Sequence, residues 1–158
     1  MAIVASIAKH DGILLLDGAM GTELQKLGLA AGERPERCNL ERPEWVESVH
    51  RRYLEAGSRI IYANTFGCSA HKLSDSGLEQ EAVIRAGIAC AKRAVAQSRK
   101  EALVALDMGP VGSLLEPNGT ISFEDAYQDY AGQVRYGVAA GCDLIVIETI
   151  SDLYEAKA

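Results

Sequence analysis

The sequence predicts an α/β fold made of the first four βα units of a (β/α)8 TIM barrel. Three observations lead to this prediction. Short apolar runs recur along the 158 residues, each run closes on a polar side chain, and helical patterns separate successive runs. Alternating strands and helices imply parallel strands joined by right-handed crossovers.

The predicted strands are nearly continuous apolar runs, which is the pattern of strands buried on both faces. They are ILLLD ending at Asp17, RIIYAN ending at Asn64, ALVALD ending at Asp107 and LIVIE ending at Glu148. In a barrel the carboxyl ends of all strands converge on one mouth, so a polar residue at every strand end favours a barrel. The alternative is an open doubly wound sheet, which needs such residues only near its switch point.

Helical patterns fill the gaps between these runs. Pro43 and Gly57 mark the start and stop of the first helix, and Ser122 and Gly141 those of the third. The apolar stripes expected to face the sheet are Val46, Val49, Tyr53 and Ala56 in the first helix, Ile84, Ile88, Ala91 and Val95 in the second, and Phe123, Tyr127, Tyr130, Val134 and Val138 in the third.

A fourth helix is expected to begin near Ser151, shortly before the sequence ends at Ala158. Eight units at this spacing need roughly twice this length. We therefore expect residues 1–158 to be the N-terminal half of a barrel, truncated in the helix after the fourth strand.

Composition narrows the function. The net charge of −6 disfavours a nucleic-acid binder, and no apolar run approaches the roughly 20 residues that cross a membrane. The N-terminus lacks the basic region of a signal peptide, so we expect a cytoplasmic protein. The cysteines, Cys38, Cys68, Cys90 and Cys142, form no C-x-x-C pair, and we interpret none as a metal ligand.

The stretch LLLDGAMGTEL ends a predicted strand on Asp17 and continues with Gly18 and Gly21. A buried acid is unfavourable unless a partner compensates it, so this carboxyl predicts a cationic ligand. Alternatively, Asp17 caps a short helix starting near Thr22 or hydrogen-bonds its own turn.

The blocks LLLDGAMGTEL, YANTFGCSAHKL, ALDMGPVGSLLEP and DLIVIETISDLYEAKA resemble, in order, the first strand–loop blocks of the homocysteine S-methyltransferase family. The likeness is greatest to the homocysteine-binding module at the N-terminus of cobalamin-dependent methionine synthases. It implies a methyltransferase whose zinc-bound homocysteine thiolate takes a methyl group to form methionine. The family's zinc cysteines lie in later blocks that this sequence lacks, and cobalamin and methyltetrahydrofolate would act through other domains.

The resemblance also assigns residues. It implies that Asp17 and Glu148 face the substrate ammonium, and that backbone N–H groups around Gly18 and Ala19, and near Asn64 and Thr65, bind the substrate carboxylate. No catalytic residue is expected in this half.

Other polar residues are interpreted structurally. Asn64 either stitches its loop together or binds the substrate. Asp107, followed by Met108, Gly109 and Pro110, is interpreted as part of a rigid loop, where it either points into the mouth or merely caps, and the structural role is preferred. His10, His50 and His71 share no common setting, and His50 is expected on a surface helix.

The expected partners are homocysteine and either the missing C-terminal half-barrel or a second copy of the chain. A non-catalytic half-barrel that self-associates or scaffolds a partner is the alternative function.

Overall fold

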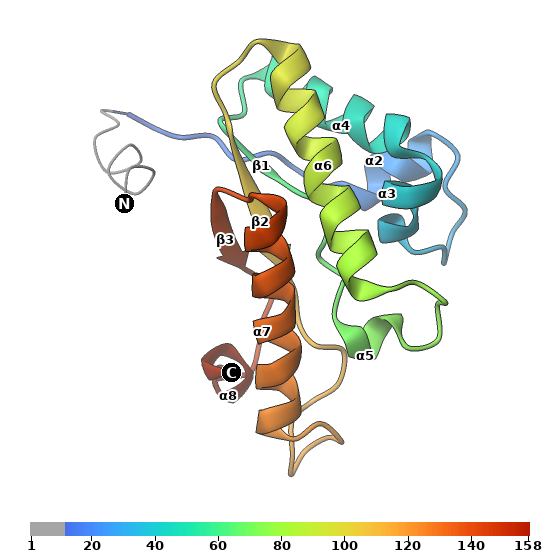
Figure 1. Ribbon diagram of the computed structural model, residues 1–158, viewed down its shortest axis with the longest axis vertical. Helices are drawn as coiled ribbons and strands as arrows, with labels where there is room; N and C mark the ends of the chain where they lie inside the picture. Colours follow the sequence, from blue (N-terminus) through green and yellow to red (C-terminus); the bar gives the residue numbers. More distant parts are fainter. Residues whose placement is uncertain (1–11) are drawn as a thin grey trace.

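The protein, for which a computed structural model describes residues 12–158, contains one parallel sheet of order β1–β2–β3. These strands are β1 (Ile60–Tyr62), β2 (Leu103–Met108) and β3 (Leu144–Ile147), with Ile60 opposite Leu103 and Ala105 opposite Leu144. The crossover helices are α4 (Pro43–Ala56), α6 (Gln80–Ser98) and α7 (Phe123–Ala140). In Figure 1, α6 and α7 lie side by side across the strands. The predicted alternation of strands and helices is confirmed.

The first predicted strand is reduced to a single bridge. Leu16 pairs in parallel with Ile60, and the Asp17 N–H donates to the Ile60 carbonyl oxygen at 3.0 Å. The run therefore takes its expected place beside β1 without forming a strand. The prediction that it is buried on both faces is wrong, because Ile13, Leu15 and Leu16 are exposed.

The short helix considered near Thr22 is present as α2 (Gly21–Lys26). Further short helices lie outside the predicted elements. They are the 3-10 helix η1 (Pro35–Arg37), α3 (Cys38–Glu41) and α5 (Ala70–Leu73). The fourth predicted helix is α8 (Leu153–Lys157). Its N-cap is Asp152, whose carboxyl accepts from the Tyr154 N–H at 2.8 Å, and not the expected Ser151.

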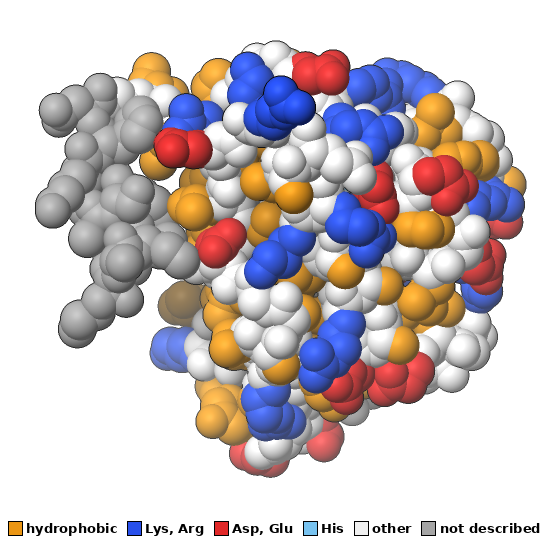
Figure 2. Space-filling view, turned by 45° about the horizontal axis from the view of Figure 1, so that its top comes forward, with side chains coloured by type: hydrophobic (Ala, Val, Ile, Leu, Met, Phe, Trp, Pro, Cys, Tyr) orange, Lys and Arg blue, Asp and Glu red, His pale blue; other side chains and the backbone are white. Residues whose placement is uncertain are grey.

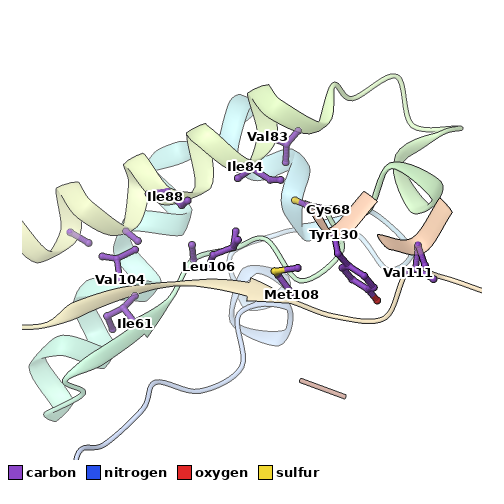
Figure 3. Packing of buried hydrophobic residues seen from close by; sticks show 14 of the residues in the cluster. Ile61, Cys68, Val83, Ile84, Ile88, Val104, Leu106, Met108, Val111 and Tyr130 are labelled. Atoms are coloured by element: carbon purple, nitrogen blue, oxygen red, sulfur yellow. The ribbon is translucent and has the colours of Figure 1, made fainter. Parts of the chain in front are cut away.

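The main core lies between the sheet and the helices. Val104, Leu106 and Met108 of β2 point to one face, where they meet Ile84 and Ile88 of α6 (Figure 3). Alternation along a strand turns the next side chain over, so Ala105 and Asp107 of β2 project to the opposite face. That face is the side that would line the inside of a barrel.

A second, smaller core cluster lies between α2, α3, α4 and α6. It consists of Leu24, Leu29, Cys38, Val46, Val49 and Cys90. Trp45 packs against this cluster at its edge, with the Arg42 guanidinium 4.5 Å from the centre of its ring.

Two of the predicted helix faces need correction. In α4, Ala56 is exposed, and Leu54 and His50 are buried beside Val46 and Val49. In α7, Tyr127 and Val138 are exposed, whereas the buried face comprises Ala126, Tyr130, Gly132, Gln133 and Gly137. Part of this buried face consists of glycine and glutamine, which a search for periodic apolar residues does not find.

Apolar side chains of β3 are exposed to solvent. Ile145 and Ile147 point into a groove of about 670 Å³, which also includes Tyr127 and Val134 of α7 and the end of α8. Ile147 is 59% exposed there. Elsewhere, acidic and basic side chains are interspersed on the face that Figure 2 shows. In the part of the chain that the structure describes, none of the helices is suited to span a bilayer.

Candidate functional site

A cavity of about 490 Å³ lies where the carboxyl ends of the strands meet. It is lined by Asp17, Gly18, Ala19, Met20, Gly21, Pro35, Glu36, Tyr62, Ala63, Asn64, Thr65, Phe66, Asp107, Glu148 and Thr149. The structure thus brings together all six residues that the sequence proposed for a site. Within residues 12–158, the lining contains four carboxyl groups and no lysine, arginine or histidine.

Asp17 is held at the edge of this cavity. Its side chain is 3% exposed, and its Oδ2 accepts a hydrogen bond from the Tyr62 N–H at 3.1 Å. Burial raises the pKa of the Asp17 carboxyl to about 7, and the nearby Glu148 contributes to that rise. The helix-capping alternative is wrong, because the N-cap of α2 is Met20 and no side chain caps that helix.

His50 lies directly behind Asp17, with its Nδ1 3.9 Å from the Asp17 Oδ2. The expectation of a surface position is wrong, since the His50 side chain is 0% exposed. Neither ring nitrogen has a hydrogen-bond partner among the described residues, and burial lowers the pKa of His50 to about 3. The imidazole is therefore neutral. Its position one helical turn after Val46 was the available sequence signal.

Asp107, the next-to-last residue of β2, has its backbone fixed by Thr65. The Thr65 hydroxyl donates to the Asp107 carbonyl oxygen at 2.9 Å and accepts from the Asp107 N–H at 3.1 Å. The Asp107 carboxyl, by contrast, has an Oδ1 that is buried and without a partner in residues 12–158. The rigid-loop interpretation therefore accounts for the backbone of Asp107 and not for its carboxyl.

The acidic surroundings of Asp107 act on its ionisation. Burial raises the pKa of Asp107 to about 8, and repulsion from Glu148 and Asp17 adds to the rise. The Asp107 carboxyl of the empty site therefore keeps its proton near neutral pH.

Glu148 follows β3, and its own N–H donates to the Met108 carbonyl oxygen at 3.1 Å. The next residue, Thr149, has φ +58°. This left-handed conformation is rare for a β-branched side chain, and backbone strain of this kind is concentrated at functional sites. The turn ends the strand while Glu148 lines the cavity.

The loop after Asp17 supplies backbone donors. In residues 12–158, no acceptor takes a hydrogen bond from the N–H groups of Gly18 or Ala19. The Tyr53 hydroxyl donates to the Ala19 carbonyl oxygen at 2.9 Å, and a Cβ at position 18 would lie 2.9 Å from that hydroxyl oxygen. Glycine at position 18 therefore makes room for Tyr53, which fixes the loop.

Asn64 and Thr65 are more occupied than the sequence suggested. The Asn64 amide donates to the Pro35 carbonyl oxygen and the Asn39 Oδ1, both at 2.8 Å, so its side chain stitches the loop together. The Thr65 N–H donates to the Ala63 carbonyl oxygen at 2.7 Å. These two residues shape the cavity wall with their main polar groups already bonded.

The cysteines do not fit a zinc site. Cys68 lies in the main core, whereas Cys38 and Cys90 lie in the second cluster. Burial raises the pKa of the Cys38, Cys68 and Cys90 thiols, that of Cys90 to about 11, whereas a metal ligand must be a thiolate. Among residues 12–158, no three His, Cys, Asp or Glu side chains are arranged to hold a metal ion.

Comparison with known proteins gives consistent matches. The profile described as homocysteine S-methyltransferase matches residues 14–158. The chain is similar to the methionine synthases of Mycobacterium tuberculosis (strain ATCC 25618 / H37Rv), at 33% identity, and Mycobacterium leprae (strain TN), at 31%. Each alignment covers 92% of this chain and 13% of the relative, so the chain spans a small part of these enzymes.

Among solved structures, the chain is similar to the homocysteine methyltransferase MmuM from Escherichia coli. The metallated form superposes with a TM-score of 0.83 at 27% identity, and the apo form with 0.74 at 28%. The match covers 98% of this chain and 59% of the metallated chain. The predicted fold class, the first four βα units of a TIM barrel, is thereby confirmed.

Proposed function

The chain belongs to the homocysteine S-methyltransferase family, and from that premise we propose that residues 1–158 form the homocysteine-binding half of a methyltransferase barrel. The observation that carries the proposal is the cavity lined by four carboxyl groups and, within residues 12–158, by no cationic side chain. An amino acid supplies the missing positive charge through its ammonium group.

The two ends of the amino-acid group find different partners in this proposal. Asp17 and Glu148 accept hydrogen bonds from the ammonium, which replaces a repulsion between carboxyl groups with an attraction. The N–H groups of Gly18 and Ala19 donate to the substrate carboxylate. The cavity then holds the substrate by its amino-acid end and leaves the thiol free for the rest of the barrel.

Zinc, which the resemblance implies, is assigned in this proposal to residues outside 1–158. Cys38, Cys68 and Cys90 are buried in two separate clusters, and Cys142 is half-buried at the edge of the main one. Cobalamin and methyltetrahydrofolate are likewise assigned to further domains. What these residues contribute is binding and orientation of homocysteine.

Calorimetric titration of homocysteine into the assembled barrel, containing this chain and the units that complete it, tests the proposal. Glu148→Gln keeps the shape of the side chain and removes its charge, so homocysteine affinity should fall about 10- to 100-fold. Glu47→Gln is the control, because Glu47 pairs with Arg93 at 2.7 Å, away from the cavity. Unchanged affinity in a folded Glu148→Gln variant would refute the site.

The partner that we propose is the complementary half of the barrel. The match to 59% of the Escherichia coli chain supports this, because the related fold continues beyond the matched part. The apolar groove beside β3 and the run with the exposed side chains of Ile13, Leu15 and Leu16 are the two edges where further units would pair.

Light scattering on this chain, with and without the complementary units, tests the partner. We expect a complex of one copy of each, and self-association when the complement is absent. A monodisperse monomer that ignores the complement at every concentration would overturn the proposal.

A further inference from the structure

Asp107 is the one carboxyl in the cavity with a buried oxygen that has no partner among the described residues. Asp107 is 7% exposed, and Glu36, another cavity acid, is 5% exposed. The Glu36 Oε1 accepts from the Gly67 N–H at 2.8 Å, whereas the Asp107 Oδ1 accepts from nothing in residues 12–158. Unsatisfied buried polar atoms are unfavourable and rare in folded proteins. This oxygen therefore indicates a group that is supplied from outside the chain.

Asp107 occupies the middle of the site. β2 is the central strand, with β1 and the run ending at Asp17 on one side and β3, followed by Glu148, on the other. Asp107 lies opposite Val146 in the register, and its pKa is raised by both Glu148 and Asp17. Carboxyl groups from the run beside β1, from β2 and from the residue after β3 thus face one cavity.

The charged groups around Asp107 favour a cationic ligand. The acidic groups that act on Asp107 are Glu148, Asp17 and Glu36, and His50 behind Asp17 is neutral. In residues 12–158 no lysine or arginine lines the cavity. A primary ammonium carries three N–H donors, one for each of Asp17, Asp107 and Glu148, and its positive charge is opposite in sign to that of a carboxylate.

We propose that Asp107 is a third carboxyl contact for the substrate ammonium, beside Asp17 and Glu148. The inference rests on the proposed function and adds a contact to it. In the empty site the Asp107 carboxyl keeps a proton near neutral pH. When the ammonium enters, it donates to Asp107 and Glu148, and the proton of Asp107 leaves to solvent. One positive charge arrives and one departs, while the ammonium keeps its three hydrogens.

The test compares two ligands that differ only at the amino group, homocysteine and 4-mercaptobutanoate, by calorimetry on the assembled protein. Asp107→Asn should weaken homocysteine about tenfold and 4-mercaptobutanoate less than twofold, because only homocysteine carries the ammonium. Asp107→Ala should weaken homocysteine further. Asp143→Asn is the matched control, since the Asp143 Oδ2 accepts from the Val104 N–H at 2.8 Å near the opposite end of the sheet.

Proton release gives a second readout that does not require the analogue to bind. Titrations near pH 7 in buffers of different ionisation enthalpy should show that wild type releases more protons on binding homocysteine than Asp107→Asn does. Equal weakening of both ligands, or unaltered homocysteine affinity and proton release in Asp107→Asn, would overturn the role of Asp107. Failure of the wild type to bind homocysteine would instead refute the proposed function.

Discussion

The buried acid Asp107, near the end of β2, differs from the buried acid Glu155 in the helix α8. Glu155 of α8 is 5% exposed, close to the 7% of Asp107. The Glu155 Oε1, however, accepts from the Val111 N–H at 2.7 Å and from the Tyr130 hydroxyl at 2.8 Å. Asp107 has similar burial with an Oδ1 that lacks a partner among the described residues. The Glu155 and Asp107 carboxyl groups are therefore similarly buried, and they differ in their hydrogen bonds.

The difference shows how one residue type performs two tasks. A carboxyl that finds donors inside the fold joins elements together, as Glu155 joins α8 to the loop after β2. A carboxyl that finds only other carboxyls destabilises the empty fold and gains from a cationic ligand. Removing each acid should therefore have effects of opposite sign on stability.

The largest expected effect is at Glu155. Glu155→Ala leaves the Val111 N–H and the Tyr130 hydroxyl without their acceptor, so the free energy of unfolding should fall by about 3 kcal/mol. Chemical denaturation measures it. Glu155→Gln retains an oxygen at the same place and should lose much less. If both variants match wild type, the joining role of Glu155 is wrong.

The second effect is a dependence of stability on pH. Folding raises the pKa of Asp17 to about 7 and of Asp107 to about 8 from 3.8, so the folded chain keeps protons that the unfolded chain has lost. Stability should therefore fall as pH rises from 6.5 to 8, by about 1–2 kcal/mol. His50, with its pKa lowered from 6.5 to about 3, acts in the opposite direction mainly below this window. Thermal unfolding across these pH values measures the slope, and a rising slope would contradict it.

A smaller effect of reversed sign is expected at Asp107. Asp107→Asn removes a poorly solvated charge beside Glu148, so the variant should be about 1 kcal/mol more stable than wild type at pH 8. Its stability should also vary less between pH 6.5 and 8. Chemical denaturation at both pH values measures the two stabilities. A destabilised Asp107→Asn variant would show that Asp107, like Glu155, has a structural role.

The smallest effect comes from a carboxyl that has a partner and remains in water. Glu81 and Arg85 pair at 2.6 Å on the exposed surface of α6. Glu81→Gln should cost about 0.3–0.5 kcal/mol, since solvent screens such pairs. Urea denaturation with and without added salt checks this. A loss as large as that of Glu155→Ala would show that partnering matters without burial.

The sequence was sufficient for the alternation of strands and helices and for six of the residues that line the cavity. Apolar runs ending on polar residues located the ends of β1, β2 and β3 to within two residues, and α4 begins at Pro43 and stops before Gly57 as the pattern indicated. Periodicity reports which side chains avoid water, and it failed where packing uses other residues. Gln133 and Gly137 of α7 are buried for this reason, and Val138 is exposed.

The roles inside the cavity were harder to predict, because they depend on contacts between distant segments. The crossovers fix which strand ends are neighbours. The sequence does not show whether a carboxyl group at a strand end accepts a hydrogen bond from another segment. The Asn64 amide donates to one acceptor in η1 and one in α3. The Asp107 carboxyl, by contrast, is surrounded by other acidic side chains. The burial of His50 was missed because the segment that it lies behind, at Asp17, is remote in the chain.

The position of Trp45 has a practical consequence for spectroscopy. It is the single tryptophan of the chain, and it packs at the edge of the smaller core cluster, under the Arg42 guanidinium. Its fluorescence therefore reports on the region of α2 to α4, while far-ultraviolet circular dichroism reports on all helices together. Coincident transitions from the two signals would show that both clusters unfold as one cooperative unit. Trp45 is thus an intrinsic fluorescent probe for the smaller core cluster.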